Sequence, residues 1–101
     1  MTDVQQRNPL VTSVSAFFPC YNDVMSIGKM VRDVRESLSI AVNDFEIIVV
    51  NDGSSDNSLD VLQELQKEIP ELRIVNHEVN RGYGGALLSG IAASTKQWVF
   101  Y

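Results

Sequence analysis

Short apolar runs alternate along this chain with stretches in which apolar residues recur every three or four positions. The apolar runs cover residues 10–18, 45–50 and 71–76, and a fourth begins near residue 97. Each run is short and rich in β-branched or aromatic residues, which is typical of strands. The stretches between them have helical spacing. The order β-α-β-α-β-α-β predicts an α/β fold: a parallel, doubly wound (Rossmann-like) sheet with three helices and right-handed crossovers.

Prolines and capping residues mark where the first elements begin and end. Residues 1–9 are polar and end at a proline, so we expect a short disordered lead before a domain over residues 10–101. Pro19 is expected to end the first strand, because proline has no amide hydrogen to donate to a sheet ladder. Asn22 or Asp23 is expected to cap the helix that follows.

The second apolar run ends on an acidic residue. Residues 45–50 read FEIIVV and predict a strand buried on both faces, and Asn51-Asp52-Gly53 predicts a turn directly after it. The next residues, SSD, can cap a helix without help from Asp52. Open α/β sheets bind their ligands at the carboxyl ends of parallel strands. Asp52 is therefore the first candidate for function, as an acid or as an acceptor for the N–H groups of a nucleotide base.

Two further loops follow strands and should lie at the same edge of the sheet. In residues 19–23 (PCYND), Tyr21 offers a flat face on which a base can stack. In residues 80–85 (NRGYGG), glycines let the backbone approach a ligand, and Arg81 offers planar donors for a base carbonyl or a diphosphate. A helix is expected to begin at residue 86. Strand ends, caps and turns also explain each loop alone, but their shared position favours a binding site.

Composition limits the chemistry of this small domain. The chain has 101 residues and a net charge of -5, which argues against nucleic acid as a partner. Cys20 and His77 are the only residues of their kinds, which excludes an internal disulfide and a thiolate metal site. A catalytic His/Ser or His/Cys pair would depend on His77 alone, and we interpret it as a structural or surface residue. No signal peptide or run of about 20 apolar residues is present, so we expect a cytoplasmic location.

Taken together, the three loop segments resemble the N-terminal half of family 2 glycosyltransferases, which have the GT-A fold. The segments are FFPCYND, EIIVVNDGSSDNS and NRGYGGALLSGIAAS, and the resemblance extends over about residues 11–101. The third segment is most similar to polyprenyl-phosphate sugar transferases, such as dolichol-phosphate mannose synthases and bactoprenol glucosyltransferases. The resemblance implies a truncated GT-A fold in which residues 10–101 form the nucleotide-binding half and the remainder of the domain is absent.

The resemblance also implies contacts to a nucleotide-sugar at the first loop. Pro19 and Tyr21 match residues that line the nucleotide base. Asp23 stands where family members usually have glutamate, so its match is less close.

In the second and third loops the resemblance implies base and nucleotide contacts. Asp52 matches the acid that hydrogen-bonds the base, which narrows its expected role from catalysis to recognition. Arg81 and Gly82 match the region that closes over the nucleotide.

Family members follow the fourth strand with an Asp-x-Asp motif that holds Mg²⁺ or Mn²⁺ on the donor diphosphate. The sequence ends where this motif is expected, so we expect no catalytic and no metal-binding residue in this chain, and no activity of the chain alone. The parent is expected to transfer a sugar from a UDP- or GDP-sugar donor to an acceptor such as a polyprenyl phosphate. Its expected location is the cytoplasmic face of a membrane.

Two other functions are compatible with the same order of elements. A receiver-like signalling module would use Asp52 as phospho-acceptor, but it needs an acidic pair after the first strand and a lysine after a later one. A non-catalytic nucleotide-binding or assembly domain is the other alternative. The final strand, over residues 98–101, would be an edge strand or would lack its partner, and we expect the chain to associate with itself through this strand.

Overall fold

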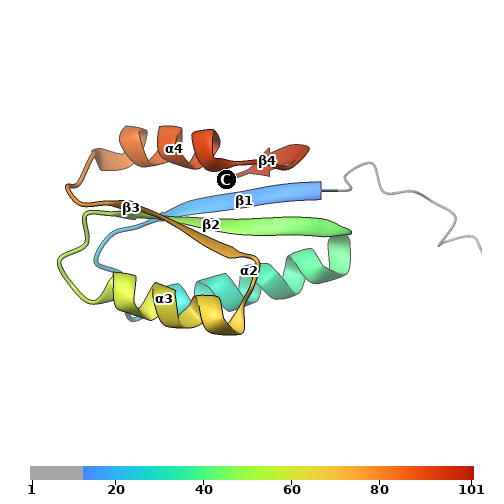
Figure 1. Cartoon of the computed structure of the whole chain (residues 1–101), viewed down its shortest axis with the longest axis horizontal. Coiled ribbons are helices and arrows are strands. Elements are labelled where there is room, and N and C mark those ends of the chain that lie inside the picture. Colours follow the sequence, from blue (N-terminus) through green and yellow to red (C-terminus); the bar gives the residue numbers. More distant parts are fainter. Residues whose placement is uncertain (1–12) are drawn as a thin grey trace, which may run out of the picture.

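A computed structural model describes residues 13–101 of the chain, so the predicted disordered lead lies outside the described residues. The elements alternate strictly along the sequence (Figure 1): β1 (Ser13–Cys20), α2 (Ile27–Ala41), β2 (Asp44–Asp52), α3 (Ser58–Glu68), β3 (Leu72–His77), α4 (Gly82–Ala93) and β4 (Trp98–Phe100). All strand pairs are parallel, and the strand order across the sheet is β3-β2-β1-β4. The predicted parallel α/β fold with three helices is therefore confirmed.

The helices form two layers around the sheet. Helices α2 and α3 cover one face, and α4 covers the other (Figure 1). Strand β2 lies between β1 and β3, and its side chains alternate between the two layers. Ile47 and Val49 pack in the cluster with α2 and α3, whereas Ile48 and Val50 pack in the cluster with α4. All four side chains are fully buried, as expected for a strand covered on both faces.

Helix α4 packs very close to the sheet because the residues that face it are small. Ala86 and Gly90 are the buried residues of this helix. A Cβ atom on Gly90 would lie 2.0 Å from Cδ2 of Phe17, a distance that real Cβ atoms do not reach. Small residues on this face therefore allow the close contact between α4 and the sheet.

Pro19 does not end β1, contrary to the sequence-based expectation. It lies inside the strand, opposite Val50 of β2, and the strand continues to Cys20. Strand β4 pairs only with residues 14–16 of β1, so beyond Ala16 the strand has a sheet neighbour on one side only. A proline is tolerated at such a position because its missing N–H leaves no ladder bond unmade.

The first helix begins later than expected, and neither predicted residue caps it. Ser26 occupies the N-cap position of α2, after a turn in which the carbonyl of Asp23 accepts from the amides of Ser26 and Ile27. Asn22 instead takes a left-handed backbone conformation, with φ of 50°, and binds the second loop. The side chain of Asn22 therefore joins two loops and does not cap α2.

Two further boundaries differ from the expected ones. Asn51 and Asp52 are the last residues of β2, so the turn begins only at Gly53. Helix α4 begins at Gly82 rather than at Ala86, so most of the glycine-rich segment forms its first turn. None of the helices in the described part of the chain has the length and hydropathy that crossing a membrane would require.

Candidate functional site

The loops after β1 and β2 are joined by Asn22 at the carboxyl edge of the sheet. Its side-chain Oδ1 accepts hydrogen bonds from the amides of Ser55 and Asp56, at 2.7 and 3.3 Å. Its own amide donates to Oγ of Ser54 at 3.0 Å. Asparagine is one of the few residues that adopt a left-handed conformation at low cost. These contacts hold the first two loops together.

The loop after β2 is in turn packed against the loop after β3. Gly53 has φ of 72°, and a Cβ atom on it would lie 2.3 Å from the backbone nitrogen of Asn80. Asn80 donates from Nδ2 to the carbonyl of Asp52 at 3.0 Å and accepts from the amide of Gly82 at 2.9 Å. Glycine at position 53 is thus required both by the backbone conformation and by the close approach. All three loops form one connected surface.

Asp52 lies at the centre of these contacts. Its side chain is only 6% exposed, and its Oδ1 accepts from the backbone amide of Arg81 at 2.8 Å and contacts Nδ1 of His77 at 2.8 Å. Burial raises the pKa of Asp52, but the hydrogen bonds from Arg81 and His77 outweigh it and hold the pKa below its usual value. The carboxylate also lies at the N-terminus of α4, where a negative charge is stabilised. Asp52 is not needed to cap α3, and its carboxylate instead accepts a hydrogen bond at the start of α4.

His77 links this carboxylate to α4. It is the last residue of β3 and lies opposite Asp52 in the parallel register. The ring is 3% exposed, and its Nε2 lies 2.7 Å from Oγ of Ser89. Because an ionised carboxylate can only accept, Nδ1 carries the donated proton, and Nε2 of a neutral ring then accepts from the Ser89 hydroxyl. His77 is therefore a structural residue and not a surface one.

The order carboxylate, imidazole and hydroxyl is also that of a nucleophilic triad. In this fold the hydroxyl of Ser89 lies in the middle of α4 and meets an imidazole that is buried against the sheet. An activated nucleophile must reach a substrate, and this arrangement directs the serine inward. We therefore assign the three residues to holding the site rather than to acyl transfer.

The other predicted site residues surround this centre. Pro19 and Tyr21 lie at the end of β1 and just beyond it, and the Tyr21 side chain is 55% exposed. Asp23 is half-buried and its Oδ1 accepts from the Ser26 hydroxyl. Arg81 is exposed.

Gly82 begins α4 with φ of 80°. Together with Arg81 it follows the loop that packs on Gly53. The six predicted residues thus share one edge of the sheet, and hydrogen bonding joins Asp52 directly to the start of α4.

A second buried acid, Glu46, anchors the other end of α4 and was not anticipated from the sequence. It accepts from Oγ of Ser15 at 2.6 Å, from the amide of Thr95 at 2.8 Å and from Nη1 of Arg73 at 2.8 Å. Burial raises the pKa of Glu46, but these hydrogen bonds outweigh burial and lower it to about 2. Arg73 also donates to the last carbonyl of α4, that of Ala93. A glutamate inside an apolar strand was the signal in the sequence that could have revealed this anchor.

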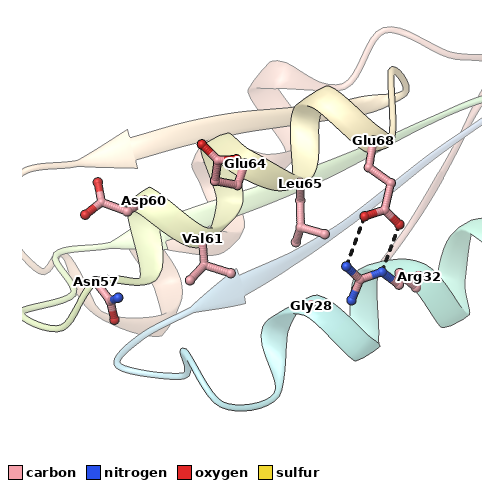
Figure 2. Close-up of a pocket in the computed structure, with 8 residues that line it drawn as sticks. All are labelled: Gly28, Arg32, Asn57, Asp60, Val61, Glu64, Leu65 and Glu68. Carbon is pink, nitrogen blue, oxygen red and sulfur yellow. Dashed lines mark hydrogen bonds and ion pairs between the residues drawn. The ribbon is translucent and has the colours of Figure 1, made fainter.

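A cavity of about 460 Å³ lies away from the candidate site, between α2 and α3 (Figure 2). Arg32 and Glu68 form a two-bond ion pair across it, at 2.9 and 3.0 Å. Its lining residues are Gly28, Arg32, Asn57, Asp60, Val61, Glu64, Leu65 and Glu68. Three carboxylates and one guanidinium make this groove acidic, which does not suit a nucleotide diphosphate. The loops at the carboxyl edge remain the better site.

A metal ion is not provided for within the described residues. Across residues 13–101, no three His, Cys, Asp or Glu side chains are grouped so that they could hold one. The polar contacts of Asp52 go instead to protein groups. Asp52 therefore has the surroundings of a hydrogen-bond acceptor rather than those of a metal ligand.

Comparison with known proteins identifies similar sequences. The family described as glycosyl transferase family 2 matches residues 15–101. The poly-beta-1,6-N-acetyl-D-glucosamine synthase of Staphylococcus epidermidis is 35% identical over 97 residues, which are 95% of this chain and 22% of that protein. The undecaprenyl-phosphate 4-deoxy-4-formamido-L-arabinose transferase of Enterobacter sp. (strain 638) is 33% identical over 87 residues, which are 84% of this chain and 26% of that protein.

A solved structure has the same fold. The mannosyltransferase PcManGT from Pyrobaculum calidifontis, described in complex with GDP-Man and Mn²⁺, matches with a TM-score of 0.76 and 22% identity. The match covers 91% of this chain and 27% of that one. At this identity the likeness shows a shared fold. The chain spans only 22% to 27% of the length of these three proteins.

Proposed function

The chain belongs to glycosyl transferase family 2, and on this basis we propose that it is the nucleotide-binding part of an enzyme that transfers a sugar from a nucleotide-diphosphate donor. The observation that carries the proposal is the meeting of three loops around Asp52 at the carboxyl edge of a parallel sheet. Ligands of open α/β sheets bind at this edge.

In this proposal Asp52 reads the base. The contacts from Arg81 and His77 both go to Oδ1, and a carboxylate has about four acceptor positions on its two oxygens, so capacity remains for a base N–H. The lowered pKa keeps the group ionised near neutral pH, when it acts as acceptor only. An imide N–H of uracil or the N–H groups of guanine would satisfy it. The donor is therefore a UDP- or a GDP-sugar.

The exposed groups around Asp52 would bind the rest of the nucleotide. The face of Tyr21, more than half exposed beside Pro19, is suited to stack on the base. Arg81 and Gly82 lie at the start of α4, where the helix dipole and a guanidinium favour the diphosphate. Asp23, beside Tyr21, would contact the base or ribose from the first loop.

The parent enzyme is proposed to need a divalent cation on the donor diphosphate, Mg²⁺ or Mn²⁺. The similar mannosyltransferase structure is described with GDP-Man and Mn²⁺, which supports a cation in this fold. Such an ion would offset charge on the leaving diphosphate. Residues 13–101 form no cluster for it, and the proposal assigns its ligands to other parts of the parent.

A polyprenyl phosphate is the acceptor that we propose. One relative is named as an undecaprenyl-phosphate sugar transferase, which supports this acceptor class. An acceptor with a long hydrocarbon chain resides in a membrane, so transfer would occur at a membrane surface, and we propose the cytoplasmic face.

We also propose that the chain associates with a second copy of itself through β4. This strand is at the edge of the sheet, paired only with β1. The side chains of Trp98, Val99 and Phe100 are each about half exposed. An apolar edge strand of this kind favours pairing with another strand.

The two alternatives are not favoured. A receiver-like module would need an acidic pair after the first strand, where this chain has Pro19-Cys20-Tyr21. The family match also favours an enzyme over a non-catalytic binding or assembly domain.

Titration of the 101-residue chain with UDP and with GDP, followed by amide NMR shifts, tests the proposal. We expect weak binding of one of them, with shifts at Tyr21, Asp52 and Arg81. An assay for hydrolysis or transfer of the matching sugar donor should show no turnover. Shifts confined to the groove between α2 and α3, or clear turnover by this chain, would contradict the proposal.

A further inference from the structure

The buried chain of hydrogen bonds from Asp52 through His77 to Ser89 is not explained by nucleotide contacts alone. We propose that His77 is a positioning residue for the nucleotide site: it holds the Asp52 carboxylate in the orientation that accepts the base. The inference rests on the proposed function, because it assumes that Asp52 reads a base.

The geometry around Asp52 supports this role. Two donors, Nδ1 of His77 and the amide of Arg81, converge on the same oxygen, each at 2.8 Å. The backbone donors to the carboxylate, Arg81 and Gly82, both come from the start of α4, whereas His77 donates from β3, and donors from two directions fix the plane of the carboxylate. Fixing Oδ1 in this way presents Oδ2 in one direction. A preoriented acceptor loses less conformational entropy when a ligand binds.

The Asp52 carboxylate places the proton of His77 on Nδ1, and Ser89 complements this tautomer on the other side of the ring. The Oγ of Ser89 lies 2.7 Å from Nε2, on the side of the ring opposite to Asp52. A hydroxyl that donates to Nε2 leaves the proton on Nδ1, where it can be donated to the carboxylate. A carboxylate partner fixes the tautomer of other imidazoles in the same way.

The same contacts couple Asp52 to α4 by two routes. Arg81, just before the helix, binds the carboxylate directly, and Ser89, in the middle of the helix, binds it through His77. The proposed base site on β2 and the proposed diphosphate site at the start of α4 therefore have a fixed relative position. The ring of His77 is only 3% exposed, so it acts through the groups that it binds.

Two substitutions that each keep a nitrogen near one ring nitrogen of His77 separate the positioning of Asp52 from the packing of the ring. In His77→Asn the amide nitrogen takes the place of Nδ1 and can still donate to Asp52. In His77→Gln the amide takes the place of Nε2, so it can still reach Ser89 but not Asp52. Both variants lose the ring, and both should be destabilised to a similar degree.

The test titrates the 101-residue chain and its variants with UDP and with GDP. We expect His77→Gln to weaken binding about tenfold or more, because a hydrogen bond to a charged group is lost. His77→Asn should recover most of that loss. Val75→Ala is the matched control: it removes packing from the same strand without touching Asp52, and should change affinity by less than about twofold.

Equal losses of affinity in His77→Asn and His77→Gln, or losses that follow the free energies of unfolding across all variants, would overturn the proposal. If the unaltered chain binds neither nucleotide, the proposed function fails. The role of His77 in positioning the Asp52 carboxylate can then be tested in the free chain. Titration of the Asp52 carboxyl carbon by NMR should then give a higher pKa in His77→Gln than in His77→Asn. Identical pKa values in the two variants would overturn the positioning role.

Discussion

Gly53 and Asn80 approach each other so closely that a Cβ atom on Gly53 would lie 2.3 Å from the Asn80 nitrogen. The two residues belong to loops that follow different strands, β2 and β3. Their contact places the backbone of the third loop directly on the turn that follows Asp52, and thereby brings the start of α4 to the carboxylate.

Replacement of Gly53 by alanine should therefore destabilise the chain by about 2 kcal/mol or more. The new methyl group would collide with backbone atoms that have little room to move, and the positive φ would add strain. Urea unfolding followed by circular dichroism measures the change. Gly84→Ala is the matched control, because nothing lies within 4 Å of its Cβ position. This control should keep or raise the stability, by up to about 1 kcal/mol; equal losses in both variants would contradict the role of the close approach.

Replacement of Asp52 by asparagine should weaken nucleotide binding about tenfold or more. The neutral amide cannot accept an N–H from the base as strongly as a carboxylate does. Calorimetric titration with the nucleotide that the unaltered chain binds measures the effect. Glu46→Gln provides the comparison, because Glu46 is also a buried, hydrogen-bonded acid on β2 but lies at the other end of α4. Both variants should lose stability, and only Asp52→Asn should lose affinity; a similar affinity in the two variants would argue against base reading.

Stability should fall in acid as Glu46 and Asp52 become protonated. The pKa of each is lower in the folded chain than its usual value, and that of Glu46 is about 2 against a usual 4.5. Their contribution is therefore fully present above the unfolded-state pKa and is lost as the pH falls through the folded-state pKa. The urea midpoint should drop between about pH 4.5 and pH 2. In Glu46→Gln this drop should be smaller, and an unchanged drop would show that other groups carry the acid sensitivity.

Replacement of Val99 by lysine should reduce self-association. A charge on the edge strand opposes pairing with a second copy. Sedimentation velocity over a range of concentrations measures the monomer fraction. Val79→Lys places the same charge at another exposed valine, in the loop after β3, and should leave association unchanged. A fully monomeric unaltered chain at high concentration would exclude the proposed contact.

The order of elements could be predicted from the sequence because each element carries its own period. The buried run of β2 and the spacing of Leu59, Leu62, Leu65 and Ile69 along α3 and its C-cap depend only on local pattern. Leu62, Leu65 and Ile69 are buried, and Leu59 is half-buried. The position of the three candidate loops at one edge of the sheet also followed from the parallel topology alone. The local pattern was sufficient to predict an element where its periodicity alone determined which side chains are buried.

The side-chain partners could not be predicted in the same way. His77 and Asp52 are 25 positions apart and meet because β2 and β3 are neighbours in register. Asn22 could be a cap by its type, and only the position of the second loop shows that it binds Ser55 instead. Pro19 was misplaced because its effect depends on whether β4 extends far enough to pair with it. Each of these outcomes depends on which strands are adjacent, and the local sequence does not contain that information.

Asp52 and Glu46 hold the two ends of α4 from the same face of one strand, and this sets a length that the helix must match. The two acids are six positions apart along β2, which corresponds to about 20 Å of extended chain. Helix α4 has 12 residues, or about 18 Å. An insertion or deletion within α4 would detach one end from its acid and rotate the buried face. Length variation in related sequences should therefore be rare in this helix and should occur in α2, α3 or their connections.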